Sequence, residues 1–165
     1  MTDLFRSPAP RELSIGDTLR KFDGNLIHVA PGGVLVRSKN EVIVASILQS
    51  LAPGRWSYER PLTIDGITKY PDFTIETPMG DEIVWEHLGM MNNPKYAADW
   101  EAKKTWYLTN GYRPYDEPDL PGARGVLIWT DDTSGVDQPV WEALAGRVIG
   151  VSASRRPTKK APGRR

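Results

Sequence analysis

The spacing of apolar and polar residues in the first third of the chain predicts a small β-hairpin followed by a helix. Between residues 17 and 36, the apolar stretches NLIHVA and GVLV are separated by DGN and PGG, which is typical of short strands joined by turns. The tetrapeptide SKNE predicts a helix start, with Ser38 as N-cap and Glu41 at the third helical position of a capping box. The apolar stripe of this helix comprises Val44, Ile47, Leu48 and Leu51.

The rest of the chain alternates between strand-like and helical patterns. Strand-like segments are expected at residues 58–64, 68–77 and 81–88. A second helix is expected to start at Asn93-Pro94 and to run to about residue 110. A buried strand, GVLIWTDD, and a closing helix at 136–148 follow a proline-rich connection. This order predicts an α/β fold with a central mixed sheet flanked by helices.

The segment ETPMGDE, residues 76–82, predicts a tight hairpin. Pro78 suits the second position of a type I turn, and Gly80 can take the left-handed conformation that closes a three-residue loop. If Thr77 faces Asp81, the residue numbers of each cross-strand pair sum to 158. The apolar side chains that this register places on one face are Phe73, Ile75, Ile83 and Trp85.

The same register sets Asp72 opposite Glu86 at the open end of the hairpin. Directly opposed residues have Cβ atoms roughly 4.5–5.5 Å apart, and like charges at that separation are destabilising. A divalent cation between the two carboxylates removes the repulsion. The alternative is an exposed polar face with a chance acidic pair, which is our interpretation of Glu76 opposite Glu82 near the turn.

The second helix carries a lysine in its inward stripe. Tyr96, Trp100, Lys103 and Tyr107 follow one another at steps of four, three and four residues, which places them on one helix face. Lys103 should therefore point toward the sheet and Lys104 more toward solvent. A buried ammonium needs a carboxylate partner, for which Asp72 and Glu86 are the candidates, unless Lys103 only extends past the aromatic rings to water.

Length and composition limit the classes of protein to consider. A chain of 165 residues is long enough for one core, and we expect an irregular arm at 1–12, one domain at 13–151 and a disordered basic tail at 152–165. No apolar run is long enough for a membrane span and the start does not resemble a signal peptide, so a cytoplasmic location is expected.

The residue types restrict any metal site to oxygen ligands. The chain has no cysteine and two histidines, which are too few for a thiolate or histidine cage, so a hard cation such as Mg²⁺ or Mn²⁺ is indicated. The formal net charge of zero hides an uneven distribution. Six of the 21 Lys and Arg residues lie in 155–165, which has no Asp or Glu, so the other 15 face 21 acidic residues and the body carries about −6.

Four segments in order, RSKNEVIVA, YPDFTI, VWEHLG and DWEAKKTWYLTNGY, resemble the PD-(D/E)XK nuclease superfamily over residues 37–130. The likeness is to stand-alone or helicase-attached nuclease modules with a restriction-endonuclease-like core. It implies Glu41, Asp72 and Glu86 as the catalytic acids. It also implies a Mg²⁺ site, with Mn²⁺ as a substitute, held by Asp72, Glu86 and the backbone carbonyl of His87, with Glu41 acting directly or through water.

The chain departs from the superfamily at its strand lysine, because Leu88 stands at that position. Some members supply this lysine from the following helix, so the resemblance implies Lys103 as the replacement and the fourth catalytic residue. An ammonium beside the attacking water would complement the metal in stabilising the charge that develops on the phosphoryl group. The His87 side chain alternates away from Glu86, and we interpret it as a packed histidine rather than a general base.

Together with the resemblance, these features predict a Mg²⁺-dependent DNA nuclease that acts as an endonuclease in DNA processing, defence or a mobile element. The acidic body suggests help from a partner such as a helicase or another DNA-processing protein, and a homodimer is also open. The alternative is a catalytically silent DNA-binding or assembly module of the same fold, and RNA stays open as a substrate. The candidate phosphate contacts are Arg37, Lys39, Lys69, Arg113, Arg155, Arg156, Lys159 and Lys160.

Overall fold

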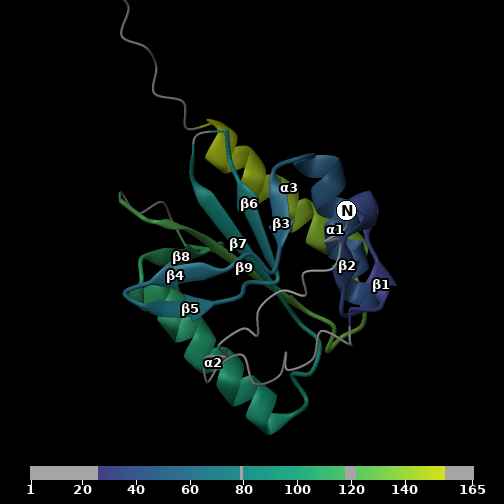
Figure 1. Ribbon diagram of the computed structural model, residues 1–165, viewed down its shortest axis with the longest axis horizontal. Coiled ribbons are helices and arrows are strands. Elements are labelled where there is room, and N and C mark those ends of the chain that lie inside the picture. Colours follow the sequence, from purple (N-terminus) through teal and green to yellow (C-terminus); the bar gives the residue numbers. More distant parts are fainter. Residues whose placement is uncertain (1–25, 79, 118–121, 155–165) are drawn as a thin grey trace, which may run out of the picture.

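The computed structural model describes residues 26–78, 80–117 and 122–154 of the chain, and its centre is a five-stranded mixed β-sheet (Figure 1). The strand order is β3-β6-β7-β9-β8. Neighbours β3, β6 and β7 are antiparallel, whereas β7, β9 and β8 are parallel. These strands are β3 (Trp56–Tyr58), β6 (Phe73–Glu76), β7 (Glu82–Leu88), β8 (Tyr112–Pro114) and β9 (Gly125–Asp131). The expected α/β class with a mixed central sheet is confirmed.

Three helices cover the two faces of the sheet. Helices α1 (Lys39–Leu51) and α3 (Gln138–Ser154) lie on one face, and α2 (Pro94–Thr109) lies on the other (Figure 1). Alternation along β7 explains why both faces are apolar: Ile83 and Trp85 belong to the core with α1 and α3, while Val84 and Leu88 belong to the core with α2. No helix in the described ranges is long and apolar enough to cross a membrane.

The predicted hairpin register is confirmed. Phe73 pairs with Trp85 and Ile75 with Ile83, so partner numbers sum to 158. At the turn, Gly80 has φ 85° and donates its N–H to the Thr77 carbonyl at 3.0 Å. The left-handed glycine closes the loop as the sequence indicated.

The acidic pair nearest this turn has a cation of its own. Glu76 and Glu82 face each other in the ladder, as expected. Arg60 bridges them, with one guanidinium nitrogen 2.5 Å from Glu76 and the other 2.6 Å from Glu82. A chance acidic pair is therefore neutralised by the protein itself.

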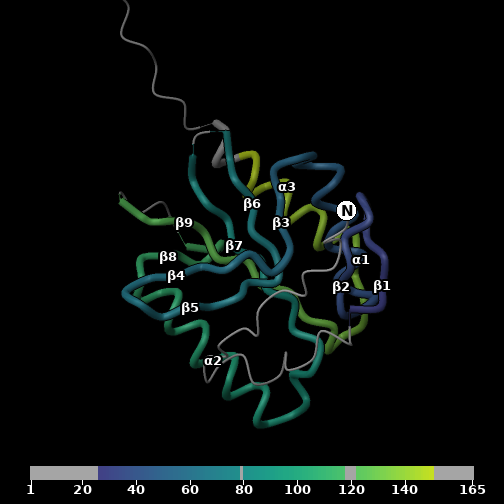
Figure 2. Tube along the Cα trace, in the orientation of Figure 1, coloured from purple at the N-terminus to yellow at the C-terminus, as the bar shows by residue number. Residues whose placement is uncertain are grey.

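The predicted continuous strands at 58–64 and 68–77 are wrong, because each is broken into two. Strand β3 ends at Tyr58, since Glu59 has φ 47° and turns the chain out of the sheet. The chain then forms a separate hairpin of β4 (Leu62–Ile64) and β5 (Ile67–Lys69), whose Asp65-Gly66 turn has positive φ at both residues. This hairpin runs beside α2 in Figures 1 and 2, where Ile64 joins the α2 core.

The remaining elements, except for β8, agree with the sequence apart from their ends. The N-terminal hairpin is β1 (His28–Val29) with β2 (Leu35–Val36), joined by a 3₁₀ turn at Pro31–Gly33. Strand β8 was not predicted. Helix α3 starts two residues later than the expected 136 and reaches Ser154, beyond the expected domain boundary at 151. The arm at 1–12 and residues 155–165 of the tail lie outside the described residues.

Candidate functional site

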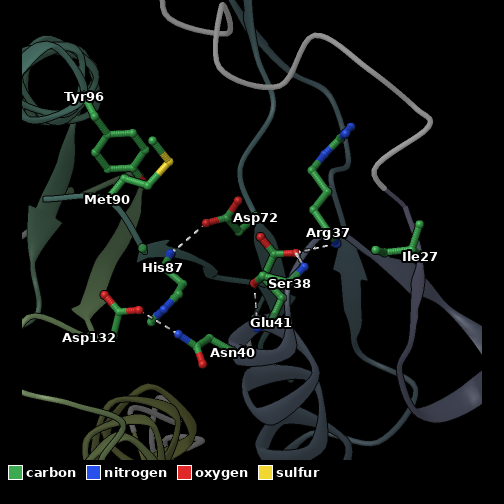
Figure 3. Close-up of a pocket in the computed structure, with 11 residues that line it drawn as sticks. Ile27, Arg37, Ser38, Asn40, Glu41, Asp72, His87, Met90, Tyr96 and Asp132 are labelled. Carbon is green, nitrogen blue, oxygen red and sulfur yellow. Dashed lines mark hydrogen bonds between the residues drawn. The ribbon is translucent and has the colours of Figure 1, made fainter. Parts of the chain in front are cut away.

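A cavity of about 470 Å³ opens where the end of β7 meets the start of α1 (Figure 3). Two of the predicted acids, Glu41 and Asp72, line it from different elements. Its lining is completed by Ile27, Arg37, Ser38, Asn40, His87, Gly89, Met90, Tyr96 and Asp132. The cavity therefore combines carboxylates with an apolar rim to which Met90 and Ile27 contribute.

Glu41 reaches the cavity from the first turn of α1. The expected capping box is present: the Ser38 side chain accepts from the Glu41 N–H, and Glu41 Oε2 accepts from the Ser38 N–H at 3.3 Å. The same Oε2 also accepts from the Arg37 N–H at 2.8 Å and from the Tyr58 hydroxyl at 2.9 Å. No hydrogen bond reaches Oε1 from the described part of the chain, so the two oxygens of this carboxylate have different surroundings.

Asp72 lies immediately before β6 and is 3 % exposed. Regular pairing of β6 with β7 begins at Phe73 and Trp85, so the expected cross-strand pair of Asp72 with Glu86 is not part of the ladder. Its Oδ2 accepts from the His87 N–H at 2.7 Å. This bond fixes the carboxylate against β7.

Glu86 lies in β7 on the α2 face of the sheet and is 2 % exposed. Its Oε1 forms an ion pair with Lys103 Nζ at 2.8 Å and accepts from the Tyr107 hydroxyl at 2.7 Å. Lys103 also donates to the Tyr70 carbonyl at 3.1 Å. The prediction that Lys103 points inward to a carboxylate is confirmed, and the partner is Glu86.

Neither Leu88 nor Lys104 serves the Glu86 carboxylate in place of Lys103. Leu88 is buried in the α2 core, where an ammonium would lose its hydration. Lys104 is half-buried, and its Nζ lies 4.4 Å from the centre of the Trp129 ring. It therefore makes a cation–π contact away from Glu86.

The His87 side chain points to the opposite face from Glu86, as expected. Its Nδ1 lies 3.0 Å from the Thr130 hydroxyl, and its ring centre lies 4.9 Å from that of Trp141. Burial lowers the pKa of the imidazole below its usual 6.5, against an opposing effect of Asp132 and Asp131. A neutral, packed histidine results, which agrees with the interpretation from sequence.

The predicted site residues thus fall into two groups. Glu41, Asp72 and His87 line the cavity, whereas Glu86 and Lys103 form a buried pair that is not part of its lining. No pattern in the sequence assigns a role to Tyr58 or to Glu59. A single tyrosine at the end of a three-residue strand carries no signal for its position beside Glu41, and only the folded chain reveals it.

Negative charge concentrates around Tyr58. Burial raises the pKa of its hydroxyl well above the usual 10, and the carboxylates of Glu41, Glu59 and Asp72 raise it further. The hydroxyl therefore keeps its proton and serves as a donor to Glu41. Three carboxylates act on one phenol, and two of them, Glu41 and Asp72, line the cavity.

The chemistry of these side chains fits a hard cation at Glu41 and Asp72. Both offer carboxylate oxygens to one cavity, and Oε1 of Glu41 has no partner among the described residues. Within residues 26–78, 80–117 and 122–154, no group of three or more His, Asp or Glu side chains has the arrangement of a complete metal cage. A backbone carbonyl, such as that of His87, and water would have to complete the ligand set.

The candidate phosphate contacts differ in their accessibility. Arg37 lines the cavity, but its guanidinium is paired with Glu59 at 2.8 Å. Lys39 is exposed, whereas Lys69 and Arg113 are buried, so Lys39 is the better placed for a phosphate. The candidates at residues 155–160 lie outside the described part of the chain.

Comparisons of the chain with protein-family models, with curated proteins and with solved structures found no match.

Proposed function

We propose that the protein is a Mg²⁺-dependent DNA nuclease of the PD-(D/E)XK type, in which Lys103 replaces the strand lysine. The observation that carries this proposal is the 2.8 Å contact between Lys103 Nζ and Glu86 Oε1. It joins a lysine of α2 to an acid of β7. In the superfamily, the lysine would instead stand on the same strand, two residues after that acid. Leu88, which occupies the usual position, is packed in the core.

Each side chain has a role that its surroundings support. Glu41 and Asp72 would hold the cation with the His87 carbonyl, while Glu86, which does not line their cavity, would hold Lys103 in place. A bound Mg²⁺ supplies a polarised phosphoryl oxygen and a more acidic water. The Lys103 ammonium would orient the attacking water or offset the negative charge that develops on the phosphoryl oxygens. The Tyr107 hydroxyl keeps Glu86 oriented by donating to the oxygen that Lys103 contacts.

The charge distribution supports action with a partner. The body of about −6 repels a polyanion, and the basic residues at 155–165 are the main compensation. A helicase or another DNA-processing protein would supply the missing affinity for DNA.

The burial of the Glu86–Lys103 pair favours a second candidate, a catalytically silent module that binds DNA or assembles with other proteins. Glu86 and Lys103 are 2 % and 7 % exposed, and neither lines the cavity of Glu41 and Asp72. In this alternative the pair is a structural link between β7 and α2. Glu41 is then only the capping residue of α1.

Incubation of supercoiled plasmid with the full chain and Mg²⁺ or Mn²⁺ separates the two candidates. The nuclease is expected to nick or linearise the plasmid, and Asp72→Asn is expected to abolish this. Asp99→Asn, a change of the same kind at a half-buried aspartate of α2 that pairs with Lys95, is the matched control. Intact plasmid with the unaltered chain, or equal cleavage by both variants, would refute the nuclease. Single-stranded DNA and RNA in parallel reactions identify the preferred substrate.

Lys103→Met and Lys104→Met test the replaced lysine. The first is expected to lower the cleavage rate at least about 100-fold, as removal of one charge-stabilising group typically does, while the second retains it. Equal activity of the two variants would refute the role of Lys103.

A further inference from the structure

The dipeptide Tyr58-Glu59, at the end of β3, contacts two of the acidic residues that line the cavity, Glu41 and Asp72. The Tyr58 hydroxyl donates to Glu41 Oε2 at 2.9 Å. The next residue, Glu59, donates its N–H to the Asp72 carbonyl at 3.0 Å. Two adjacent residues therefore connect the start of α1 to the chain that carries Asp72.

The side chain of Glu59 strengthens this connection. Its two oxygens accept from Arg37 Nε at 2.8 Å and Nη2 at 3.1 Å, in the paired geometry that suits a guanidinium and a carboxylate. The Arg37 N–H in turn donates to Glu41 Oε2 at 2.8 Å. A closed set of contacts thus runs from Glu41 through Tyr58 and Glu59 to Arg37 and back to Glu41.

The backbone of Glu59 is strained in this arrangement. Its φ of 47° is uncommon for a residue other than glycine and costs of the order of 1 kcal/mol or more. Such a conformation persists where several interactions fix it, and here they are the Asp72 carbonyl and the Arg37 guanidinium. Strained residues of this kind gather at functional sites.

The contacts leave Glu41 with one oxygen for a ligand. Oε2 accepts from Tyr58, Arg37 and Ser38, whereas Oε1 accepts from no described residue. A carboxylate held in this way can offer a cation only one oxygen. Mg²⁺ and Mn²⁺ take six ligands, several of them water, while Ca²⁺ takes six to eight and often binds both oxygens of a carboxylate.

We infer that Tyr58 and Glu59 form a clamp that presents Oε1 of Glu41 beside Asp72 and so makes the site selective for Mg²⁺ and Mn²⁺ over Ca²⁺. Tyr58 is a positioning residue: it acts through Glu41 and does not touch the cation. This inference rests on the proposed function, in which Glu41 and Asp72 hold a divalent cation. It adds the means by which the protein chooses among cations.

Calorimetric titration of the full chain with Mn²⁺ and with Ca²⁺ tests the clamp. Tyr58→Phe removes one hydroxyl and retains the ring that packs on Phe73 at 5.3 Å. It is expected to raise the Kd for Mn²⁺ about tenfold, as the loss of a group that orients a metal ligand typically does. The Kd for Ca²⁺ should change by less than about threefold, because a freed carboxylate gains a second oxygen for the larger ion.

Two further variants make the test specific. Tyr115→Phe is the matched control, since the Tyr115 hydroxyl makes no hydrogen bond with any described residue, and it should leave both Kd values within about twofold. Glu59→Gln, which retains the size of the side chain but not its charge, should shift the ratio of the two Kd values in the same direction as Tyr58→Phe. Thermal unfolding of each variant verifies that it is folded at the temperature of titration.

The outcomes separate the clamp from the proposed function. If Asp72→Asn abolishes Mn²⁺ binding while Tyr58→Phe and Tyr115→Phe both bind like the unaltered chain, the clamp is refuted and the metal site stands. If Asp72→Asn binds Mn²⁺ with the same affinity as the unaltered chain, the metal site is refuted and the clamp with it. The same follows if neither the unaltered chain nor Asp72→Asn binds Mn²⁺. A Mn²⁺-to-Ca²⁺ ratio that narrows in Tyr58→Phe and Glu59→Gln but not in Tyr115→Phe supports the clamp.

Discussion

Breaking the Glu86–Lys103 pair should destabilise the protein far more than removing a neighbouring lysine. Lys103→Met retains the length of the side chain and most of its packing, but it removes the ammonium that lies 2.8 Å from the buried Glu86 carboxylate. Glu86 is 2 % exposed, so water cannot replace the lost partner. Removal of one member of a buried pair typically costs about 3–5 kcal/mol, because the other charge is left uncompensated.

The structure narrows this range. Tyr107 still donates to Glu86 at 2.7 Å in the variant, which reduces the loss. The bond from Lys103 to the Tyr70 carbonyl, at 3.1 Å, disappears and adds about 1 kcal/mol. We therefore expect a loss of about 3–4 kcal/mol. A domain of this size has about 5–15 kcal/mol of stability in total, so the variant should be folded but markedly less stable.

Urea unfolding followed by tryptophan fluorescence measures the effect, with Lys104→Met as the control. Lys104 loses only a partly exposed cation–π contact, for which about 0.5–1 kcal/mol is expected. The double variant Glu86→Gln with Lys103→Met removes both charges and should recover much of the loss. If Lys103→Met costs no more than Lys104→Met, or if the costs of the two single variants add in the double variant, the pair does not stabilise the fold as described.

Further predictions concern the centre of the sheet, the buried histidine and a helix cap. Gly125→Ala should destabilise the protein by at least about 2 kcal/mol, because the added Cβ would lie 2.2 Å from a backbone oxygen of β7. In α3, the Cβ added by Gly146→Ala has no neighbouring atom within 4 Å, so this variant should be more stable by about 0.5–1 kcal/mol. Thermal unfolding of the two variants measures both effects. The pKa of His87 is lower in the folded than in the unfolded chain, so this residue contributes stability that is present above about pH 6.5 and is lost as the pH falls toward its folded value. Urea unfolding of His87→Asn should therefore show a shallower loss between about pH 7.5 and 5, and an unchanged slope would contradict the assignment. Asn93→Ala removes a side chain that accepts from two N–H groups in the first turn of α2 and should cost about 1 kcal/mol in chemical denaturation, against no measurable loss for the neighbouring Asn92→Ala.

Local signals in the sequence were sufficient to predict the parts of the site that lie on helices and strands. The capping box placed Glu41 at the start of α1, and the stripe of α2 turned Lys103 toward the sheet. The glycine turn set the hairpin register that brings Asp72 to the end of β7. Each of these features depends on residues a few positions apart, and for that reason it could be predicted.

The features that depend on contacts between residues distant in sequence could not be predicted. Glu59 leaves the sheet in a left-handed conformation that its residue type does not indicate, and Arg37, 22 residues earlier, is one of the groups that hold it there. Strand β8 is only three residues long and exists through its pairing with β9. Asp72 lines the cavity, whereas Glu86 pairs with Lys103. This difference depends on regular pairing of β6 beginning only at Phe73, which the hairpin register alone does not predict.

The late position of β9 in the chain has a consequence for how the protein folds. Glu41, Asp72, Glu86 and Lys103 all precede residue 104, yet β9, which pairs with the whole of β7, begins only at Gly125. Until β9 arrives, β7 is an edge strand with a row of unpaired backbone groups and apolar side chains on both faces, which is a template for pairing with other chains. A chain that ends before residue 125 should therefore aggregate, and folding should be slow because the parallel pairing joins distant segments.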